Sequence, residues 1–147
     1  MNVVILCDSK FGNTRRLAES MSAALHPDHH VELRGADDGL GRMTGIDVLL
    51  VGGPTHAHGA STALKHALAA IPADALKGAR VAAFDTRFRM PRVLTGSAAA
   101  DTSKLLRRSG YDVIAPAESF FVTREDPPAL VPGEIDRARS WARAIVS

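Results

Sequence analysis

The sequence has a single cysteine, Cys7, so no disulfide can form within the chain, which agrees with a reducing compartment. It has no apolar run long enough to span a bilayer, and its N-terminus lacks the charged segment and apolar core of a signal peptide. We therefore expect a cytoplasmic protein without membrane segments. The chain also lacks a long run of Lys or Arg, and its formal net charge is only +2. Neither a nucleic acid nor a membrane surface is an expected partner.

Repeats, linkers and low-complexity segments are absent from the sequence as well. With 46% hydrophobic and 23% charged residues, the composition is typical of a globular protein and excludes the disordered and disulfide-rich classes. A chain of 147 residues suits one hydrophobic core. We expect a single domain over residues 1–147.

Apolar runs alternate along the chain with segments of helical periodicity. Residues 2–7 are continuously apolar, which indicates a strand buried on both faces. Apolar side chains then recur every four residues in a helix that begins near Asn13 and ends at Pro27. The further expected strands are 31–34, 46–51, 80–85 and a fifth that Pro116 splits into 111–115 and 118–122; the further expected helices are 64–71, 98–109 and 134–146.

This alternation predicts an α/β fold, a doubly wound five-stranded parallel sheet with helices on both faces. Ligands of such folds bind beyond the carboxyl ends of the strands. The turns after the first, third and fourth strands have an unusual composition, so we expect them to carry the function.

The first of these turns reads Ser-Lys-Phe-Gly-Asn-Thr, residues 9–14, and leads into a helix. Its hydroxyls, its glycine and the successive amides at a helix N-terminus favour an anion, most simply a phosphate. The alternative is that Asn13 or Thr14 only caps the helix. The turn is neither a Walker A motif nor a dinucleotide-binding G-x-G-x-x-G.

The second turn, residues 53–59, reads Gly-Pro-Thr-His-Ala-His-Gly. Together the two turns resemble the flavodoxin family, whose phosphate loop reads approximately Ser/Thr-x-Thr-Gly-x-Thr and whose next flavin loop often begins with Pro-Thr. The resemblance extends through "VVILCDSKFGNT", "VGGPTHAHGAS", "VAAFDTRFR" and the final split strand and helix. Because no long insertion fits between Val113 and Phe121, the chain resembles the short-chain class. The resemblance implies strand order 2-1-3-4-5 and bound FMN.

The resemblance also implies which residues hold the cofactor. The FMN phosphate would lie on Ser9, Lys10, Phe11, Gly12, Asn13 and Thr14. The flavin ring would be bordered on one side by Pro54, Thr55, His56, Ala57, His58 and Gly59, and on the other by Asp85, Thr86, Arg87 and Phe88.

The chain departs from the family pattern in three ways. Phe11 replaces the middle hydroxyl residue of the phosphate loop, which removes a donor. The flavin loops contain no Trp or Tyr, so ring stacking falls to Phe88, His56 or His58. The chain is slightly basic, whereas electron-carrying flavodoxins are usually acidic.

Three arginines, Arg87, Arg89 and Arg92, follow the fourth strand closely. One hypothesis is that Arg87 lies near the flavin N1/O2 edge and stabilises the anionic reduced form. The alternative is that all three are solvated or neutralised by Asp85.

Other motifs carry weaker signals. His56 and His58 could chelate a metal but lack acidic or cysteine partners, so no metal site is expected. A phosphorylated receiver domain is rejected, because it needs clustered carboxylates after the first strand and another at the end of the third, where the chain has only Asp8 and Gly52-Gly53-Pro54. The segment 95–97 could bind an anion, although Ser97 as an N-cap explains it more simply. Cys7 is expected to be a buried apolar residue.

The sequence thus predicts an FMN-binding protein that transfers electrons to or from a redox partner protein, with no catalytic acid or base. An FMN-dependent reductase of a small acceptor such as a quinone is one alternative. A non-redox binding module that has kept the fold is the other.

Overall fold

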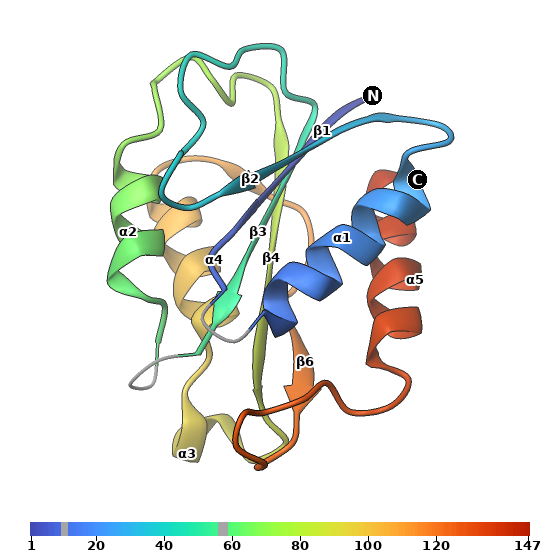
Figure 1. Cartoon of the computed structure of the whole chain (residues 1–147). Coiled ribbons are helices and arrows are strands. Elements are labelled where there is room, and N and C mark those ends of the chain that lie inside the picture. The colour runs from blue at the N-terminus through green and yellow to red at the C-terminus, as the bar shows by residue number, and fades with distance from the viewer. Residues whose placement is uncertain (10–11, 56–58) are drawn as a thin grey trace.

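The structure is a computed structural model that describes residues 1–9, 12–55 and 59–147. Across these residues, six strands form one sheet in the order β2-β1-β3-β4-β5, and β6 pairs with the far half of β4 (Figure 1). All the strand pairs are parallel. The strands are β1 (Asn2–Cys7), β2 (His30–Gly35), β3 (Val48–Pro54), β4 (Arg80–Phe88), β5 (Asp112–Val113) and β6 (Glu118–Val122). The predicted sheet, its order and the split at Pro116 are confirmed.

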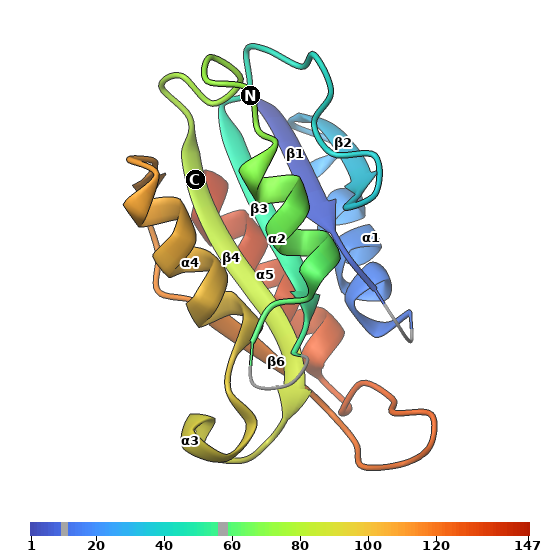
Figure 2. The same cartoon turned by 90° about the vertical axis from the view of Figure 1, so that its left-hand side faces the viewer.

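Helices cover both faces of the sheet. In Figures 1 and 2, α1 and α5 lie on one face, and α2 and α4 lie on the other. The helices are α1 (Asn13–Leu25), α2 (Thr62–Ala69), α3 (Arg92–Thr95), α4 (Ala98–Arg108) and α5 (Glu134–Val146). Among the described helices, none is both long and apolar enough to cross a membrane.

The apolar core has two halves, one under each helical layer. Alternate residues of β1 explain this division: Val3 and Ile5 pack towards α1 and α5, whereas Val4 and Leu6 pack on the opposite side. This two-sided burial is the reason why β1 is continuously apolar. Each such side chain contributes roughly 1.5–3 kcal/mol through its removal from water.

An aromatic cluster fixes the end of the sheet under α5. The Phe84, Phe120 and Trp141 rings meet edge to face, with centroids 5.8–6.3 Å apart. A Cβ at position 52 would overlap the Phe84 ring, so Gly52 is needed on the neighbouring strand. The cluster therefore sets β3 against β4 just before both strands reach the carboxyl edge.

Several predicted strand boundaries are wrong: β2 is one residue longer at each end than the predicted 31–34, β5 is limited to 112–113 of the predicted 111–115, and β3 and β4 differ most. β3 starts at Val48 and continues to Pro54, although the predicted strand was 46–51, because Gly52, Gly53 and Pro54 pair in register with residues 84–86 of β4. β4 continues to Phe88, because β6 pairs with its last five residues. The short helix α3 was not predicted.

Candidate functional site

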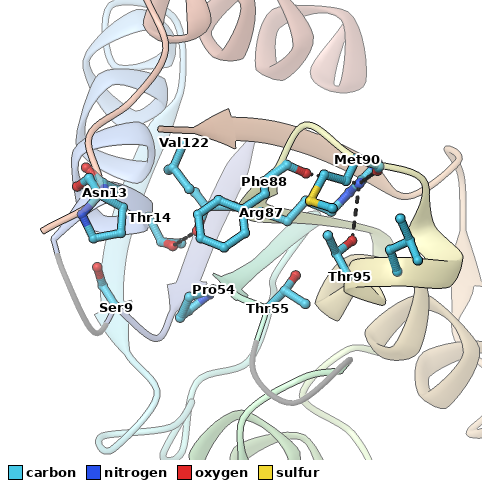
Figure 3. A pocket seen from close by; sticks show the side chains of 13 residues that line it. Ser9, Asn13, Thr14, Pro54, Thr55, Arg87, Phe88, Met90, Thr95 and Val122 are labelled. Carbon is cyan, nitrogen blue, oxygen red and sulfur yellow. Dashed lines mark hydrogen bonds between the residues drawn. The ribbon is translucent and has the colours of Figure 1, made fainter. Parts of the chain in front are cut away.

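The carboxyl ends of β1, β3, β4 and β6 border a cavity of about 330 Å³ (Figure 3). A cavity of this size lies at the lower end of the range for small-molecule sites. It is lined by eight of the predicted site residues: Ser9, Asn13, Thr14, Pro54, Thr55, Thr86, Arg87 and Phe88. Five further residues complete the lining: Met90, Leu94, Thr95, Val122 and Pro128.

The other predicted residues lie outside this lining. Gly12, Gly59 and Asp85 are close to the cavity in sequence but do not line it. Lys10 and Phe11, and also residues 56–58, which include both histidines of the weighed metal site, fall outside the described residues. Within the described ranges, no group of three or more Cys, His, Asp or Glu side chains could hold a metal ion.

The first turn leads into α1 through a left-handed glycine. Gly12 has φ 81° and occupies the N-cap position, so the N-cap residue itself gives no side-chain hydrogen bond to the helix. Asn13 instead donates from Nδ2 to the Pro128 carbonyl at 2.8 Å, and Thr14 Oγ1 lies 3.1 Å from Thr86 Oγ1. The alternative that Asn13 or Thr14 caps α1 is therefore wrong. Both side chains connect the start of α1 to other parts of the site.

The N-terminus of α1 carries an unusual charge. Its first turn contains no acidic residue and two arginines, Arg15 and Arg16. Arginines there oppose the helix dipole, whose positive end lies at the N-terminus. Arg15 is paired with Glu19 at 3.1 Å, and both side chains are at least half exposed. The Ser9 hydroxyl accepts from the Arg15 amide at 3.2 Å, so Ser9 also faces this turn. The helix end is thus a positive site beside the cavity.

The second turn is held at its start by Asp85. The Thr55 hydroxyl donates to Asp85 Oδ2 at 3.4 Å and accepts from the Ala98 amide at 3.1 Å. Asp85 is fully buried, and its Oδ2 also accepts from the Ser97 hydroxyl and, at 2.9 Å, from the Ala99 amide. Among the described residues, none donates to Asp85 Oδ1. This carboxylate therefore joins β4, the second turn and the N-terminus of α4.

The far end of the second turn is fixed by two other carboxylates. Ser61 donates its hydroxyl to Asp8 Oδ2 at 2.5 Å while capping α2. The Ala60 amide donates to Asp101 Oδ2 at 3.2 Å. Asp8 is thus part of the scaffold of the turn, in keeping with the rejection of a receiver site.

The end of β4 supplies the aromatic side of the cavity. The Phe88 ring points into the cavity (Figure 3) and is 37% exposed. Pro54, Met90 and Val122 add apolar surface around it. The Arg124 guanidinium lies 6.0 Å from the Phe88 centroid, within the range of a cation–π contact.

Arg87 is held by several contacts at the edge of the cavity. Its Nε donates to Ser119 Oγ at 2.9 Å, and its Nη1 donates to the Met90 carbonyl at 2.6 Å. The guanidinium also lies 5.2 Å from the Phe121 centroid. Burial lowers the pKa of Arg87 from its ordinary value, while the nearby Asp85 charge opposes that shift. No ion pair joins Arg87 to Asp85 within the described part of the chain.

Two weaker motifs also have clear positions. Ser97 is the N-cap of α4 and accepts from the Ala100 amide, as the simpler interpretation predicted. Cys7 is 3% exposed, and burial raises the pKa of its thiol to about 11. An inert buried thiol agrees with the sequence-based expectation.

The sequence did not point to the lining residues on α3 and after β6. The chain following β6 folds back through an antiparallel bridge between Val122 and Leu130, which brings Pro128 to Asn13. The prolines of residues 126–132 were the available signal, since they mark a constrained loop at the same edge. A contact across 115 positions cannot be inferred from local patterns.

The sequence matches no protein-family model and no curated protein. The structure is similar to those of solved flavodoxins. Flavodoxin 1 from Bacillus cereus has a TM-score of 0.76 at 18% identity, with 99% of this chain and 97% of that chain covered. A flavodoxin from the domain Archaea also has a TM-score of 0.76, at 16% identity, with 99% and 96% covered.

A further similar structure belongs to a longer protein. Rubredoxin oxygen:oxidoreductase from Desulfovibrio gigas has a TM-score of 0.72 at 17% identity, and the match covers 98% of this chain but 35% of that chain. At such identities the likeness concerns the fold. The chain has a flavodoxin-like fold, with parallel strand order 2-1-3-4-5, helices on both faces and the cavity at the carboxyl edge.

Proposed function

We propose that the chain binds FMN in the cavity at the carboxyl edge and transfers electrons to or from a redox partner protein. The observation that carries this proposal is the polarity of the cavity. The cavity adjoins the positive N-terminus of α1, and Phe88 with apolar neighbours is among the residues that line it. A ligand with an anionic group at one end and a flat ring at the other suits this arrangement.

The phosphate end has suitable donors. The first amides of an α-helix have no partner within the helix, and here they follow Gly12, whose φ of 81° fits glycine. Ser9 and Asn13 add polar side chains to the lining. The absence of acidic residues from the first turn leaves no carboxylate there to compete with a phosphate.

The ring end has suitable apolar surface. Pro54, Phe88, Met90 and Val122 are apolar lining residues, and Phe88 is the aromatic side chain available for stacking among the described lining residues. When bound, FMN supplies the electron-carrying chemistry, which these residues do not possess. The side chains bind and orient the cofactor and exclude water from part of its ring. The buried thiol of Cys7 accords with the proposed cytoplasmic setting.

An absorbance spectrum tests the cofactor assignment. Purified protein is given excess FMN and desalted, and the spectrum is then recorded. Flavin bands that remain at about one FMN per chain support the proposal. Complete loss of flavin contradicts it and favours the non-redox binding module.

The partially exposed ring pocket favours one second candidate. Because Phe88 is 37% exposed, a small acceptor such as a quinone could approach the same site. An FMN-dependent reductase would turn over such an acceptor with a chemical electron donor and no second protein. An electron carrier would need the partner protein for turnover.

A further inference from the structure

Exposed apolar side chains are concentrated beside the cavity. Among the described residues, four large apolar side chains are exposed, and three of them belong to residues 88–94: Phe88 at 37%, Val93 at 86% and Leu94 at 57%. The fourth is Met1, at the other end of β1. Clustered apolar exposure is typical of an interaction surface.

Two arginines lie in the same segment as these apolar side chains, and a third approaches Phe88. Arg89, Arg92 and Arg124 are exposed, and within the described ranges none of them forms an ion pair. The sequence contains no Asp or Glu between Asp85 and Asp101. The Arg124 guanidinium lies 6.0 Å from the Phe88 centroid, although the exposed Glu125 and Asp126 follow it in the chain, so the uncompensated positive charge is that of residues 87–92.

The surface rests on a supported segment rather than on a free loop. Arg87 Nη1 donates to the Met90 carbonyl at 2.6 Å, just before α3, and to Thr95 Oγ1 at 3.4 Å, in the last residue of α3. Arg92 Nη2 donates to the Ala117 carbonyl at 3.2 Å, although Arg92 remains exposed. A segment that is already held in place loses less conformational entropy when it binds a partner.

The surface also adjoins the candidate site. Phe88 and Leu94 line the cavity as well as being exposed. In Figure 1, α3 lies at the end of the sheet where β4 and β6 finish. A protein docked on α3 would therefore lie next to whatever occupies the cavity.

We propose that this surface docks an acidic protein, a redox partner that presents carboxylates around an apolar centre. The docking surface is formed by Phe88, Arg89, Arg92, Val93, Leu94 and Arg124. The proposal rests on the proposed electron-transfer function, and it specifies the charge of the partner. Complementary charge speeds encounter and fixes orientation, and its effect weakens as salt rises. The direct access to the cavity favours a protein partner over a nucleic acid or an anionic membrane.

Amide NMR of the full-length ¹⁵N-labelled chain, loaded with FMN, tests the proposal. The probe is an acidic plant-type [2Fe–2S] ferredoxin, and basic cytochrome c is the comparison. We expect the ferredoxin to shift or broaden amides of residues 88–95 and 123–126, with binding at least about tenfold weaker at high salt than at low salt. Absence of ferredoxin binding at low salt, tighter binding of cytochrome c, or perturbation confined to other faces would overturn the proposal.

Charge-reversed variants separate this surface from general electrostatics. Arg89→Glu/Arg92→Glu should weaken ferredoxin binding at least about tenfold. Arg107→Glu/Arg108→Glu changes the same net charge at the exposed far end of α4 and should have less than about a twofold effect. Val93→Glu replaces a side chain that is 86% exposed, so it should fold normally and should also weaken ferredoxin binding. It tests the same surface if the arginine variant folds poorly. Equal losses of ferredoxin affinity in the two double variants, together with unchanged affinity in Val93→Glu, would refute the proposed docking surface.

Two further readouts distinguish the remaining outcomes. Vesicles containing phosphatidylglycerol should leave residues 88–95 unperturbed, and perturbation by vesicles without ferredoxin binding would overturn the protein-docking proposal. If the chain retains FMN but does not bind the ferredoxin, only the proposed docking surface is refuted. Docking of the ferredoxin by a chain that cannot hold FMN refutes only the cofactor assignment.

Discussion

Thr14 Oγ1 at the start of α1 lies 3.1 Å from Thr86 Oγ1 near the end of β4, and both side chains are nearly fully buried. This hydrogen bond joins two segments that are 72 residues apart in the chain. Both residues line the cavity. The pair therefore fixes the N-terminus of α1 relative to the strand that carries Phe88.

The Thr14 and Thr86 pair predicts a non-additive mutant cycle. Either single change, Thr14→Val or Thr86→Val, leaves one buried hydroxyl without its partner and should lower the free energy of unfolding by about 1–3 kcal/mol. The double variant removes both hydroxyls and should be less destabilised than the sum of the single variants. Urea unfolding of the four proteins measures this, and strict additivity would contradict the coupling.

Asp85 gives a second prediction, because its buried carboxylate joins β4 to α4 and to Thr55. Asp85→Ala should lower the free energy of unfolding by about 1–3 kcal/mol, since it removes an acceptor from the N-terminus of α4. Exposed Asp112→Ala on β5 is the control and should change stability by less than about 0.5 kcal/mol. Unchanged or increased stability of Asp85→Ala in urea unfolding would show that burial of this charge outweighs its hydrogen bonds.

Glu134 at the start of α5 predicts an acid-sensitive contribution to stability. Burial raises the pKa of this carboxyl, but hydrogen bonds from Arg137 and the Phe121 amide more than offset that effect, so its pKa lies below the ordinary value. A carboxyl whose pKa is depressed on folding stabilises the protein above its unfolded pKa of about 4.3. This contribution is lost as pH falls through the folded pKa.

The pH dependence of unfolding in Glu134→Gln checks this sign. The variant should be less stable at pH 7 by about 1–3 kcal/mol and should lose less stability than the wild type below about pH 4.3. Glu19→Gln, in an exposed pair with Arg15, serves as the matched control. If the wild type and Glu134→Gln lost the same free energy of unfolding as the pH falls, the result would be inconsistent with a depressed pKa of Glu134.

The role of Arg87 near the bound flavin remains a prediction. If its positive charge stabilises reduced flavin, Arg87→Ala should make the potential for full reduction more negative, on the order of 20–60 mV. Arg89→Ala, which removes an exposed charge from the same segment, is the comparison. An unchanged potential in a redox titration of Arg87→Ala would leave Arg87 with only its contacts to Ser119 and Met90.

Local patterns in the sequence were sufficient for most of the fold. β1 and α5 have the predicted bounds, because burial on both faces and helical periodicity are visible along a short stretch of chain. The end of β3 was not predictable in this way. Glycine and proline usually mark turns, but residues 52–54 pair with β4, and Gly52 makes room for the Phe84 ring. That requirement comes from a neighbouring strand.

The candidate site was predictable to a similar extent. Eight of its lining residues lie in the turns that the resemblance pointed to, whereas α3 and the chain after β6 were missed. Val122, Pro128 and Leu94 reach the cavity through tertiary contacts that no local pattern encodes. The surface proposed for docking combines Phe88, Arg89 and Arg92, which the sequence analysis named, with Val93, Leu94 and Arg124, which it did not.

The most direct test of the central claim compares the affinities of the chain for FMN and for riboflavin by quenching of flavin fluorescence. If the N-terminus of α1 holds the phosphate, FMN should bind at least about a hundredfold more tightly, the equivalent of one to two hydrogen bonds to a charged group. Equal affinities would contradict a phosphate site at α1, and failure to bind either flavin would contradict the proposed cofactor.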